Sequence, residues 1–238
     1  MTRLTALAAL ALLGGAGSRE ALPNLVELPP ASLEVEQVGG HDVLRFTSTV
    51  ENDGSGPLVV LSTRRRVDTR FTSVQLVGTR PVPVSVELHY RRSGGHDHFH
   101  LVGFERYELR DGFGRLVARD RKVGFCLGDR RSVGGERPRW LGTCGRGSPR
   151  ALRIEQGLSP GFADPYASDL GGQSLDVSGL PAGEYVLVNV VNPTRALRES
   201  DYGDDVASVR FALARPPAPA GIAFVQVLAT CRSARCPG

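Results

Sequence analysis

The sequence predicts an all-β fold, an antiparallel β-sandwich with long functional loops, on three observations. Short runs in which apolar and polar residues alternate recur along the chain. These runs are bounded by turn signals such as GG, NDGSG and RDGFG. No long segment keeps a helical period over three turns. With 238 residues, of which 41% are hydrophobic, the chain can bury the core of one sandwich.

Ten runs are predicted as strands because their side chains alternate between two faces. They lie at residues 32–38, 42–52, 57–63, 72–78, 84–92, 99–111, 115–127, 184–192, 206–213 and 222–229. Residues 19–25 and 192–200 could each hold a short helical turn. The Gly, Arg, Ser and Pro content of residues 128–174 predicts long loops, and loops of that length in a compact domain are usually functional or disordered.

The first 18 residues resemble a secretory signal peptide, since Arg3 precedes an apolar run from Leu4 to Leu13 and small residues follow. That run is too short to span a membrane, and no later run is longer. We therefore expect a secreted, extracellular protein without a membrane span. One domain over residues 19–213 is expected, followed by a Pro-rich linker and a disulfide-closed tail over residues 214–238.

The chain has four cysteines, an even number that suits an oxidising compartment. Cys231 and Cys236 close a short loop, which leaves Cys126 and Cys144 as the natural second pair. The sequence alone allows three pairings.

The charge pattern gives weak support for nucleic-acid binding. The net charge is +4, and the basic residues scatter among acids without a basic helix or an aromatic stripe, so no nucleic-acid partner is expected. Lys122 is the only lysine in the chain. Codon bias in a GC-rich genome accounts for most of the arginine excess, and the retained lysine suggests a specific role.

Three of the five histidines, His96, His98 and His100, occupy alternate positions, which places them on one face of a strand. In a straight strand the outer two Cα atoms lie roughly 13 Å apart, so the strand must bend or begin irregularly to gather all three rings. Gly94 and Gly95 permit that bend. Three imidazoles with an open position suit Zn²⁺ or Cu²⁺, and affinity favours copper. The alternative is an exposed His-rich turn. His89 is expected to be a packed or surface residue, and His41 receives no role.

With these residues in view, the chain resembles the catalytic domain of the lysyl oxidase family and looks like a microbial-type member. The shared motifs are LRF, HDHFH followed by FERYELRD, KVGFCL, QGLSPGFADPYASD and VNPTRALRESDYGDDV. The similarity runs in order from LPNLVELPP to SVRF. Each motif alone is moderately specific, and the ordered set is strong.

The resemblance implies a copper amine oxidase whose quinone cofactor forms from its own side chains. His96, His98 and His100 match the copper ligands, while Lys122 and Tyr166 match the two halves of the lysine tyrosylquinone. The implied reaction converts a primary amine, either a protein lysine or a small amine, to an aldehyde and consumes O₂. Ammonia and hydrogen peroxide are released. The reaction also needs a general base, for which Asp164 is the candidate.

The resemblance also implies a structural calcium site. Acidic side chains follow one another closely in ESDYGDD, and hard oxygen ligands of this kind suit Ca²⁺. In the family the matching segment holds calcium together with residues near the start of the catalytic domain. The implied ligands here are Asn24, the carbonyl of Leu25, Glu199, Asp201, Asp204 and Asp205. An unoccupied acidic loop is the alternative.

The chain departs from animal members of the family, which have more cysteines, including at the positions of Gly95 and Phe162. The absence of those partners is consistent with a Cys126–Cys144 pair. Two other functions remain open: a noncatalytic secreted metal-binding β-sandwich that serves as an interaction module, and a His₃ zinc hydrolase. The zinc hydrolase would leave Lys122 and Tyr166 without a role.

Overall fold

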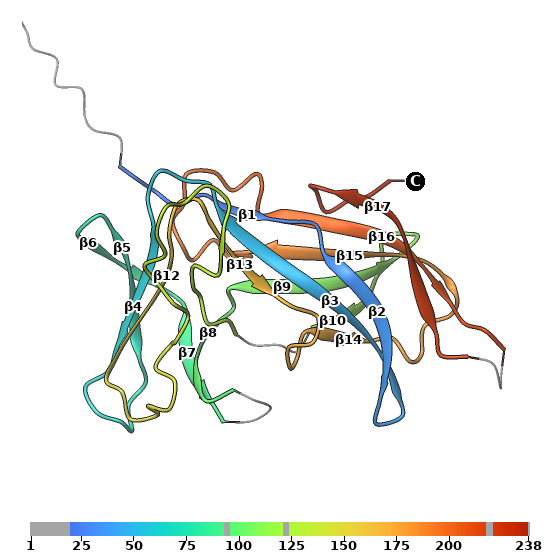
Figure 1. Ribbon diagram of the computed structural model, residues 1–238, viewed down its shortest axis with the longest axis horizontal. Coiled ribbons are helices and arrows are strands. Elements are labelled where there is room, and N and C mark those ends of the chain that lie inside the picture. Colours follow the sequence, from blue (N-terminus) through green and yellow to red (C-terminus); the bar gives the residue numbers. More distant parts are fainter. Residues whose placement is uncertain (1–19, 93–95, 121–123, 218–220, 238) are drawn as a thin grey trace, which may run out of the picture.

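The fold consists of antiparallel β-sheets, which confirms the predicted class (Figure 1). The computed structural model describes residues 20–92, 96–120, 124–217 and 221–237. This part of the chain contains no helix, and so none with the length and apolarity that a membrane crossing requires. The predicted signal peptide lies outside the described residues.

The largest sheet is built around one long strand, β3 (His41–Asn52). Its neighbours are β1 (Leu25–Glu27), β2 (Ala31–Val38), β13 (Phe162–Tyr166) and β14 (Ser174–Asp176), and β11 (Arg131–Ser132) pairs with β13. The five-stranded sheet contains, in order, β10 (Leu116–Arg119), β9 (Glu105–Asp111), β15 (Gly183–Val191), β16 (Val206–Ala214) and β17 (Phe224–Cys231). β17 pairs with β16, so the C-terminal segment extends this sheet.

Two smaller sheets complete the described fold. The four-stranded sheet contains, in order, β12 (Arg153–Leu158), β4 (Leu58–Thr63), β5 (Thr72–Val77) and β6 (Arg80–Val84). β7 (Glu87–Arg91) and β8 (His98–Val102) form a two-stranded sheet. Figure 1 shows the four-stranded sheet at the left of the molecule and the five-stranded sheet at the right.

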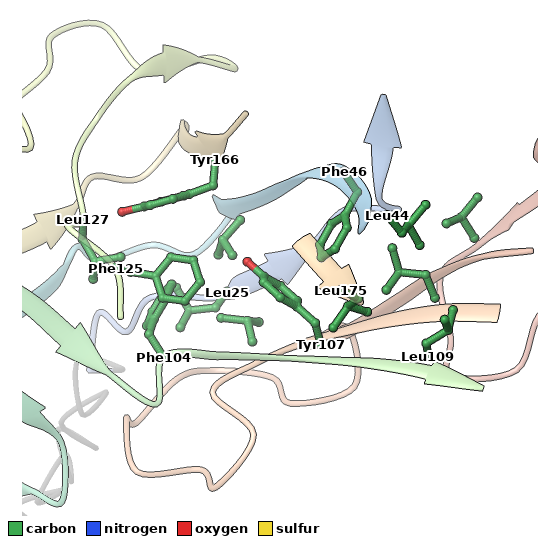
Figure 2. Packing of buried hydrophobic residues seen from close by; sticks show 14 of the residues in the cluster. Leu25, Leu44, Phe46, Phe104, Tyr107, Leu109, Phe125, Leu127, Tyr166 and Leu175 are labelled. Carbon is green, nitrogen blue, oxygen red and sulfur yellow. The ribbon is translucent and has the colours of Figure 1, made fainter. Parts of the chain in front are cut away.

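The main core lies between the β3 sheet and the five-stranded sheet. Alternate residues of β3, including Leu44 and Phe46, are fully buried, as are Tyr107 and Leu109 of β9. The rings of Phe46 and Tyr107 meet edge to face with their centroids 4.9 Å apart, which ties the two sheets together (Figure 2). The alternation of buried and half-buried residues along β3 is the pattern expected of a strand with one face in the core.

Two local predictions were wrong. Residues 128–174 contain β11, β12 and β13 in addition to loops, and β12 pairs along its whole length with β4. Residues 20–25 and 192–200 form no helix, and the Arg195 N–H closes only a single turn on the Asn192 carbonyl. The Ser200 N–H donates to the Pro23 carbonyl, and the Asn192 side chain bonds the backbone of Leu197.

A pair of buried acids lies in the core beside these sheets. The Ser48 hydroxyl oxygen lies 2.6 Å from Glu105 Oε2 and 3.2 Å from Glu27 Oε1. A hydroxyl donates only one proton, so one of the two contacts requires a protonated carboxyl group. Burial, followed by the charge of Glu105, raises the pKa of Glu27 well above its ordinary value of 4.5.

Replacing Glu27 with glutamine is expected to flatten the dependence of stability on pH. A carboxyl whose folded pKa is raised stabilises the fold at low pH, and this contribution is lost as pH rises above 4.5, by at most about 1.4 kcal/mol per pH unit. Urea unfolding at pH 5, 7 and 9 measures the slope. Glu34→Gln, at an exposed position, is the control, and an unchanged slope in Glu27→Gln would contradict the buried proton.

Candidate metal centre and active site

The three predicted histidines converge at the start of β8. His98 and His100 lie on the strand and His96 lies in the irregular chain before it, as the distance argument required. Their ring nitrogens lie within 4.8 Å of one another, and the Nε2 atoms of His98 and His100 are 2.9 Å apart. No other group of three histidine, cysteine or acidic residues in the described chain is gathered this closely. The predicted bend at Gly94 and Gly95 lies outside the described residues.

The electrostatics of this cluster favour neutral imidazoles, the form that binds a metal ion. Burial, followed by the charge of the neighbouring His96, lowers the pKa of His98 to about 4. The Nδ1 atom of His98 is buried without a hydrogen-bond partner among the described residues. Three imidazole nitrogen donors fit Cu²⁺ or Zn²⁺, with copper bound more tightly at equal availability.

The two other histidines are not members of this cluster, although His89 lies opposite His100 in the β7–β8 pair. The side chain of His89 is 51% exposed and lies 2.9 Å from Glu87. His41 is exposed and pairs with Asp176.

The histidines open onto a cavity of about 280 Å³ that also contains the predicted tyrosine. Its other charged lining residues, Arg130, Arg146 and Asp169, were not identified from the sequence. The position of Asp169, three residues after Tyr166, was the only signal that could have indicated it. The cavity therefore brings together nitrogen ligands, a phenol, two guanidinium groups and a carboxylate.

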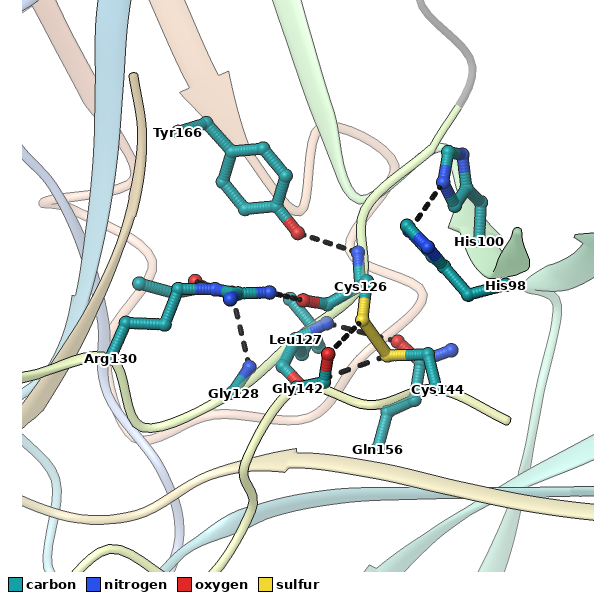
Figure 3. The surroundings of a disulfide bond; sticks show 11 residues. His98, His100, Cys126, Leu127, Gly128, Arg130, Gly142, Cys144, Gln156 and Tyr166 are labelled. Carbon is teal, nitrogen blue, oxygen red and sulfur yellow. Dashed lines mark hydrogen bonds and ion pairs between the residues drawn. A yellow bond between two sulfur atoms is a disulfide. The ribbon is translucent and has the colours of Figure 1, made fainter. Parts of the chain in front are cut away.

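Tyr166, the last residue of β13, is buried with its hydroxyl directed toward Cys126 (Figure 3). The Cys126 N–H donates to the phenolic oxygen at 2.5 Å, and the ring packs against Phe125 with centroids 4.6 Å apart. Burial raises the pKa of Tyr166 well above its usual value, while Arg130 and the Cys126 N–H act in the opposite direction. The phenol is thus held in one orientation by groups that favour negative charge on its oxygen.

Asp164 lies two residues before Tyr166 in β13, where it is buried and does not line the cavity. Its carboxylate accepts hydrogen bonds from Arg130 Nε at 2.6 Å and from the Gly128 N–H at 3.1 Å. Burial raises the pKa of Asp164 to about 7, although Arg130 opposes the shift. The ion pair fixes Arg130, whose guanidinium carbon lies 6.0 Å from the centre of the Tyr166 ring.

The disulfide between Cys126 and Cys144 joins two segments that flank the histidines. The Cys144 carbonyl accepts a hydrogen bond from the Phe99 N–H at 2.9 Å, so the disulfide connects the tyrosine contact to β8. The second disulfide joins Cys231 and Cys236. The structure contains both cysteine pairs that the sequence favoured.

Lys122 lies outside the described residues. Two residues later, Gly124 lines the cavity against His100. A Cβ atom added to Gly124 would lie 2.5 Å from His100 Cβ, so only glycine allows the chain to pass this close. Gly124 is therefore packed closely against a predicted metal ligand.

The acidic segment is brought to the start of β1, as the predicted calcium set requires. Asn24 Nδ2 donates to Asp204 Oδ2 at 2.9 Å, and the Leu25 N–H donates to Glu199 Oε2 at 2.8 Å. Burial and neighbouring carboxylates raise the pKa of Glu199 to about 8 and that of Asp205 to about 7.

Two oxygens in this segment, Asp204 Oδ1 and Asp205 Oδ1, are buried without a partner among the described residues. Asp201 is exposed and accepts a hydrogen bond from the Gly203 N–H. These carboxylates do not form a group as tight as the histidine cluster.

The comparisons with known proteins agree with this site. The family model for lysyl oxidase matches residues 59–216, most of the described chain. The chain belongs to the lysyl oxidase family. All three histidines, Lys122 and Tyr166 lie within the matched residues.

Several characterised members of the lysyl oxidase family are similar to this chain. Protein-lysine 6-oxidase of Rattus norvegicus is 36% identical over 113 residues, which cover 47% of this chain and 25% of the rat protein. The enzyme of the same name from Sus scrofa is 35% identical over 47% of this chain and 42% of its own length. Human lysyl oxidase homolog 1 is 34% identical over 47% of this chain and 18% of its own length. The match spans less than half of each relative.

The histidine cluster predicts one tight site for Cu²⁺. Replacing His98 with alanine removes a nitrogen ligand and is expected to weaken copper binding at least about tenfold. His89→Ala, on the adjacent strand, is the control and should bind copper like the unmodified protein. Equilibrium dialysis with metal analysis measures both affinities, and equal losses in the two variants would contradict the assigned ligands.

Proposed function

We propose that this member of the lysyl oxidase family is a copper-dependent amine oxidase. It would convert a primary amine to an aldehyde, with O₂ as the oxidant and ammonia and hydrogen peroxide as products. The observation that supports this proposal most is that three imidazoles and the buried phenol of Tyr166 line one cavity. A zinc hydrolase would not need that phenol.

The proposed cofactor is a lysine tyrosylquinone derived from Lys122 and Tyr166, with copper held by His96, His98 and His100. The quinone supplies an electrophile and an electron sink for oxidation of the amine. The described residues fit it, because the phenol lies in the cavity of the nitrogen ligands and the chain that follows Lys122 passes against His100.

In this proposal the protein holds and polarises Tyr166. The Cys126 N–H and the Arg130 guanidinium stabilise negative charge on the phenolic oxygen, and Asp164 keeps Arg130 in place. Arginine suits this position because it stays charged and cannot compete with a lysine amine as a nucleophile. Arg130 is therefore proposed as a positioning residue.

Asp164 remains the proposed general base, since a pKa of about 7 suits proton transfer near neutral pH. Asp169 is the alternative base, because it is the carboxylate that lines the cavity. The two proposals differ in the position of the base: Asp169 lines the cavity, whereas Asp164 is buried outside it.

We further propose that calcium binds between the start of β1 and the acidic segment. Buried carboxylate oxygens without partners and raised carboxyl pKa values indicate like charges that a cation would neutralise. The proposed ligands come from both segments: Asn24, Leu25, Glu199, Asp201, Asp204 and Asp205. Calcium would then fasten β1 to the loop before β16.

Secretion is also part of the proposal. Both disulfides suit an oxidising compartment, and residues 1–18 are proposed as a cleaved signal peptide. Residues 19–213 would form the catalytic domain, and residues 214–238 a linker and tail.

Aerobic loading with copper is expected to produce a peptide that joins Lys122 to Tyr166, together with reactivity toward phenylhydrazine. Peptide mapping by mass spectrometry and amine-dependent peroxide release measure the two outcomes. Lys122→Arg should abolish both and leave the copper content unchanged, because arginine cannot attack the oxidised phenol.

Tyr185→Phe, in the distant five-stranded sheet, is the control and should form the crosslink normally. Separate, unmodified peptides after full copper loading would instead favour a noncatalytic metal-binding module.

Calcium is expected to stabilise copper-free protein against unfolding. At a calcium concentration about a hundred times its Kd, the gain is about 2.7 kcal/mol. Thermal unfolding with calcium, with magnesium and with a chelator measures it. Asp205→Asn should reduce the gain, whereas Asp68→Asn, at an exposed position in another loop, should retain it. An equal response of both variants would count against the site.

A further inference from the structure

The C-terminal tail forms one wall of a groove on the outer face of the five-stranded sheet. The groove has a volume of about 590 Å³, and the turn between β9 and β10, residues 111–114, forms the wall on the other side. No residue that lines this groove also lines the histidine cavity. The groove is therefore a second concave site, and it includes a segment to which neither the metal centre nor the acidic segment gives a role.

Two arginines lie on the floor of the groove. Val186 of β15 pairs with Arg110 of β9 on one side and with Arg210 of β16 on the other. Directly opposed residues in antiparallel strands point to the same face of a sheet. Because the neighbours of Val186, Tyr185 and Leu187, are buried in the main core, this row of three faces outward. The Cα atoms of the two arginines are separated by two strand spacings, about 10 Å.

The disulfide between Cys231 and Cys236 folds the tail back over the same face of the sheet. The Ser208 hydroxyl of β16 donates to the Ser233 carbonyl at 2.7 Å, which fixes the tail against this strand. Cys236 is buried, whereas Arg235 beside it is exposed and lines the groove. The tail thereby holds a third guanidinium group at the rim.

Arginines outnumber acids around the groove. Three of them share the single carboxylate of Glu108 at distances of 2.7 to 3.2 Å: Arg106, Arg110 and Arg119. One carboxylate neutralises only one of these three charges. Arg235 forms no ion pair within the described part of the chain. The excess positive charge favours an anionic ligand.

The protein does not satisfy the two arginines of the floor completely. Their Nε atoms are buried without a hydrogen-bond partner among the described residues. The side chains of Arg110 and Arg210 are 39% and 21% exposed, so their outer N–H groups can still reach a ligand. A guanidinium group binds a carboxylate through two parallel hydrogen bonds, which suits a ligand with several carboxylate groups.

An aromatic ring stands at the rim of the groove. Phe113 is 87% exposed in the turn between β9 and β10. The Gly114 N–H donates to the Asp111 carbonyl at 2.8 Å, and Gly114 has a φ of +81°, so the turn is tight and holds the ring outside the core. An exposed aromatic ring beside polar groups can pack against the apolar C–H face of a sugar ring.

This combination fits an acidic polysaccharide better than a nucleic acid. Single-stranded nucleic acids stack successive bases on several aromatic rings. The lining has two aromatic residues, and one of them, Tyr185, packs its ring against Phe211 in the core. The exposed carboxylate of Glu184, also in the lining, repels phosphate groups but accepts hydrogen bonds from sugar hydroxyl groups.

We propose that this groove binds an acidic polysaccharide whose sugars carry carboxylate groups, and that the disulfide-closed tail is part of the binding site. Arg110, Arg210 and Arg235 bind the carboxylates, and Phe113 packs against a sugar ring. Binding would hold the protein on an anionic polymer. The inference does not rest on the proposed amine oxidase function, because the two sites share no lining residue.

Oligosaccharide binding tests the groove without any need for copper or catalysis. The probe is a fluorescein-labelled hexamer of galacturonate. A matched hexamer, in which every carboxylate is a methyl ester, keeps the sugar rings and removes the charge. A labelled single-stranded DNA hexanucleotide tests whether any polyanion suffices. Fluorescence anisotropy at pH 7 measures each Kd at low and at high salt.

The galacturonate hexamer is expected to bind at least about tenfold more tightly than its methyl ester and than the hexanucleotide, and to bind more weakly at high salt. Arg235→Glu should weaken binding about tenfold. Arg232→Glu, at an exposed position of the same tail outside the lining, should have little effect. Phe113→Ser should weaken binding about fivefold, whereas Leu141→Ser, at a 73% exposed position in another loop, should not.

Equal affinities for the galacturonate hexamer and its methyl ester would overturn the proposal, as would equal losses in Arg235→Glu and Arg232→Glu. No binding of the galacturonate hexamer to the unmodified protein would also overturn it. Tighter binding of the hexanucleotide that Arg235→Glu removes would assign the groove to nucleic acid instead.

Discussion

The arrangement of the candidate site depends on how β8 is bonded along the edge that faces away from β7. Leu101 exchanges two backbone hydrogen bonds with Phe125, and the Phe99 N–H bonds the Cys144 carbonyl. These bonds place the Cys126–Cys144 disulfide and the Tyr166 contact beside the two histidines of the strand. The histidines and the tyrosine belong to separate sheets, because Tyr166 lies in the β3 sheet and His100 does not, and these bonds join the two.

Burial around this junction explains the chemistry that the site can support. Desolvation lowers the pKa of His98 and raises those of Asp164 and Tyr166, so each group is driven toward its neutral form. Arg130 opposes the last two shifts and gives the cavity a fixed positive charge. Metal binding and amine chemistry use groups of this kind: a neutral imidazole, a polarised phenol and a carboxyl group with a pKa of about 7. In the core, burial likewise raises the pKa of Glu27, which lies near the charge of Glu105.

A second cluster of charged side chains lies at the start of β1. At one end, the acidic segment meets the start of β1 and gathers carboxylates that a cation would neutralise.

The sequence by itself determined the fold class, the strands of the main core and the triplet of histidines, because these depend on local periodicity. It favoured the two disulfide pairs that the structure contains but allowed three pairings. Only the tertiary structure decided that β12 and β13 form strands in a region rich in glycine and proline, since their pairing partners lie about a hundred residues earlier in the chain. Only the tertiary structure identified Arg130 and Asp169 as residues of the site. An isolated charged residue carries no periodic signal in the sequence, and only packing shows which cavity it lines.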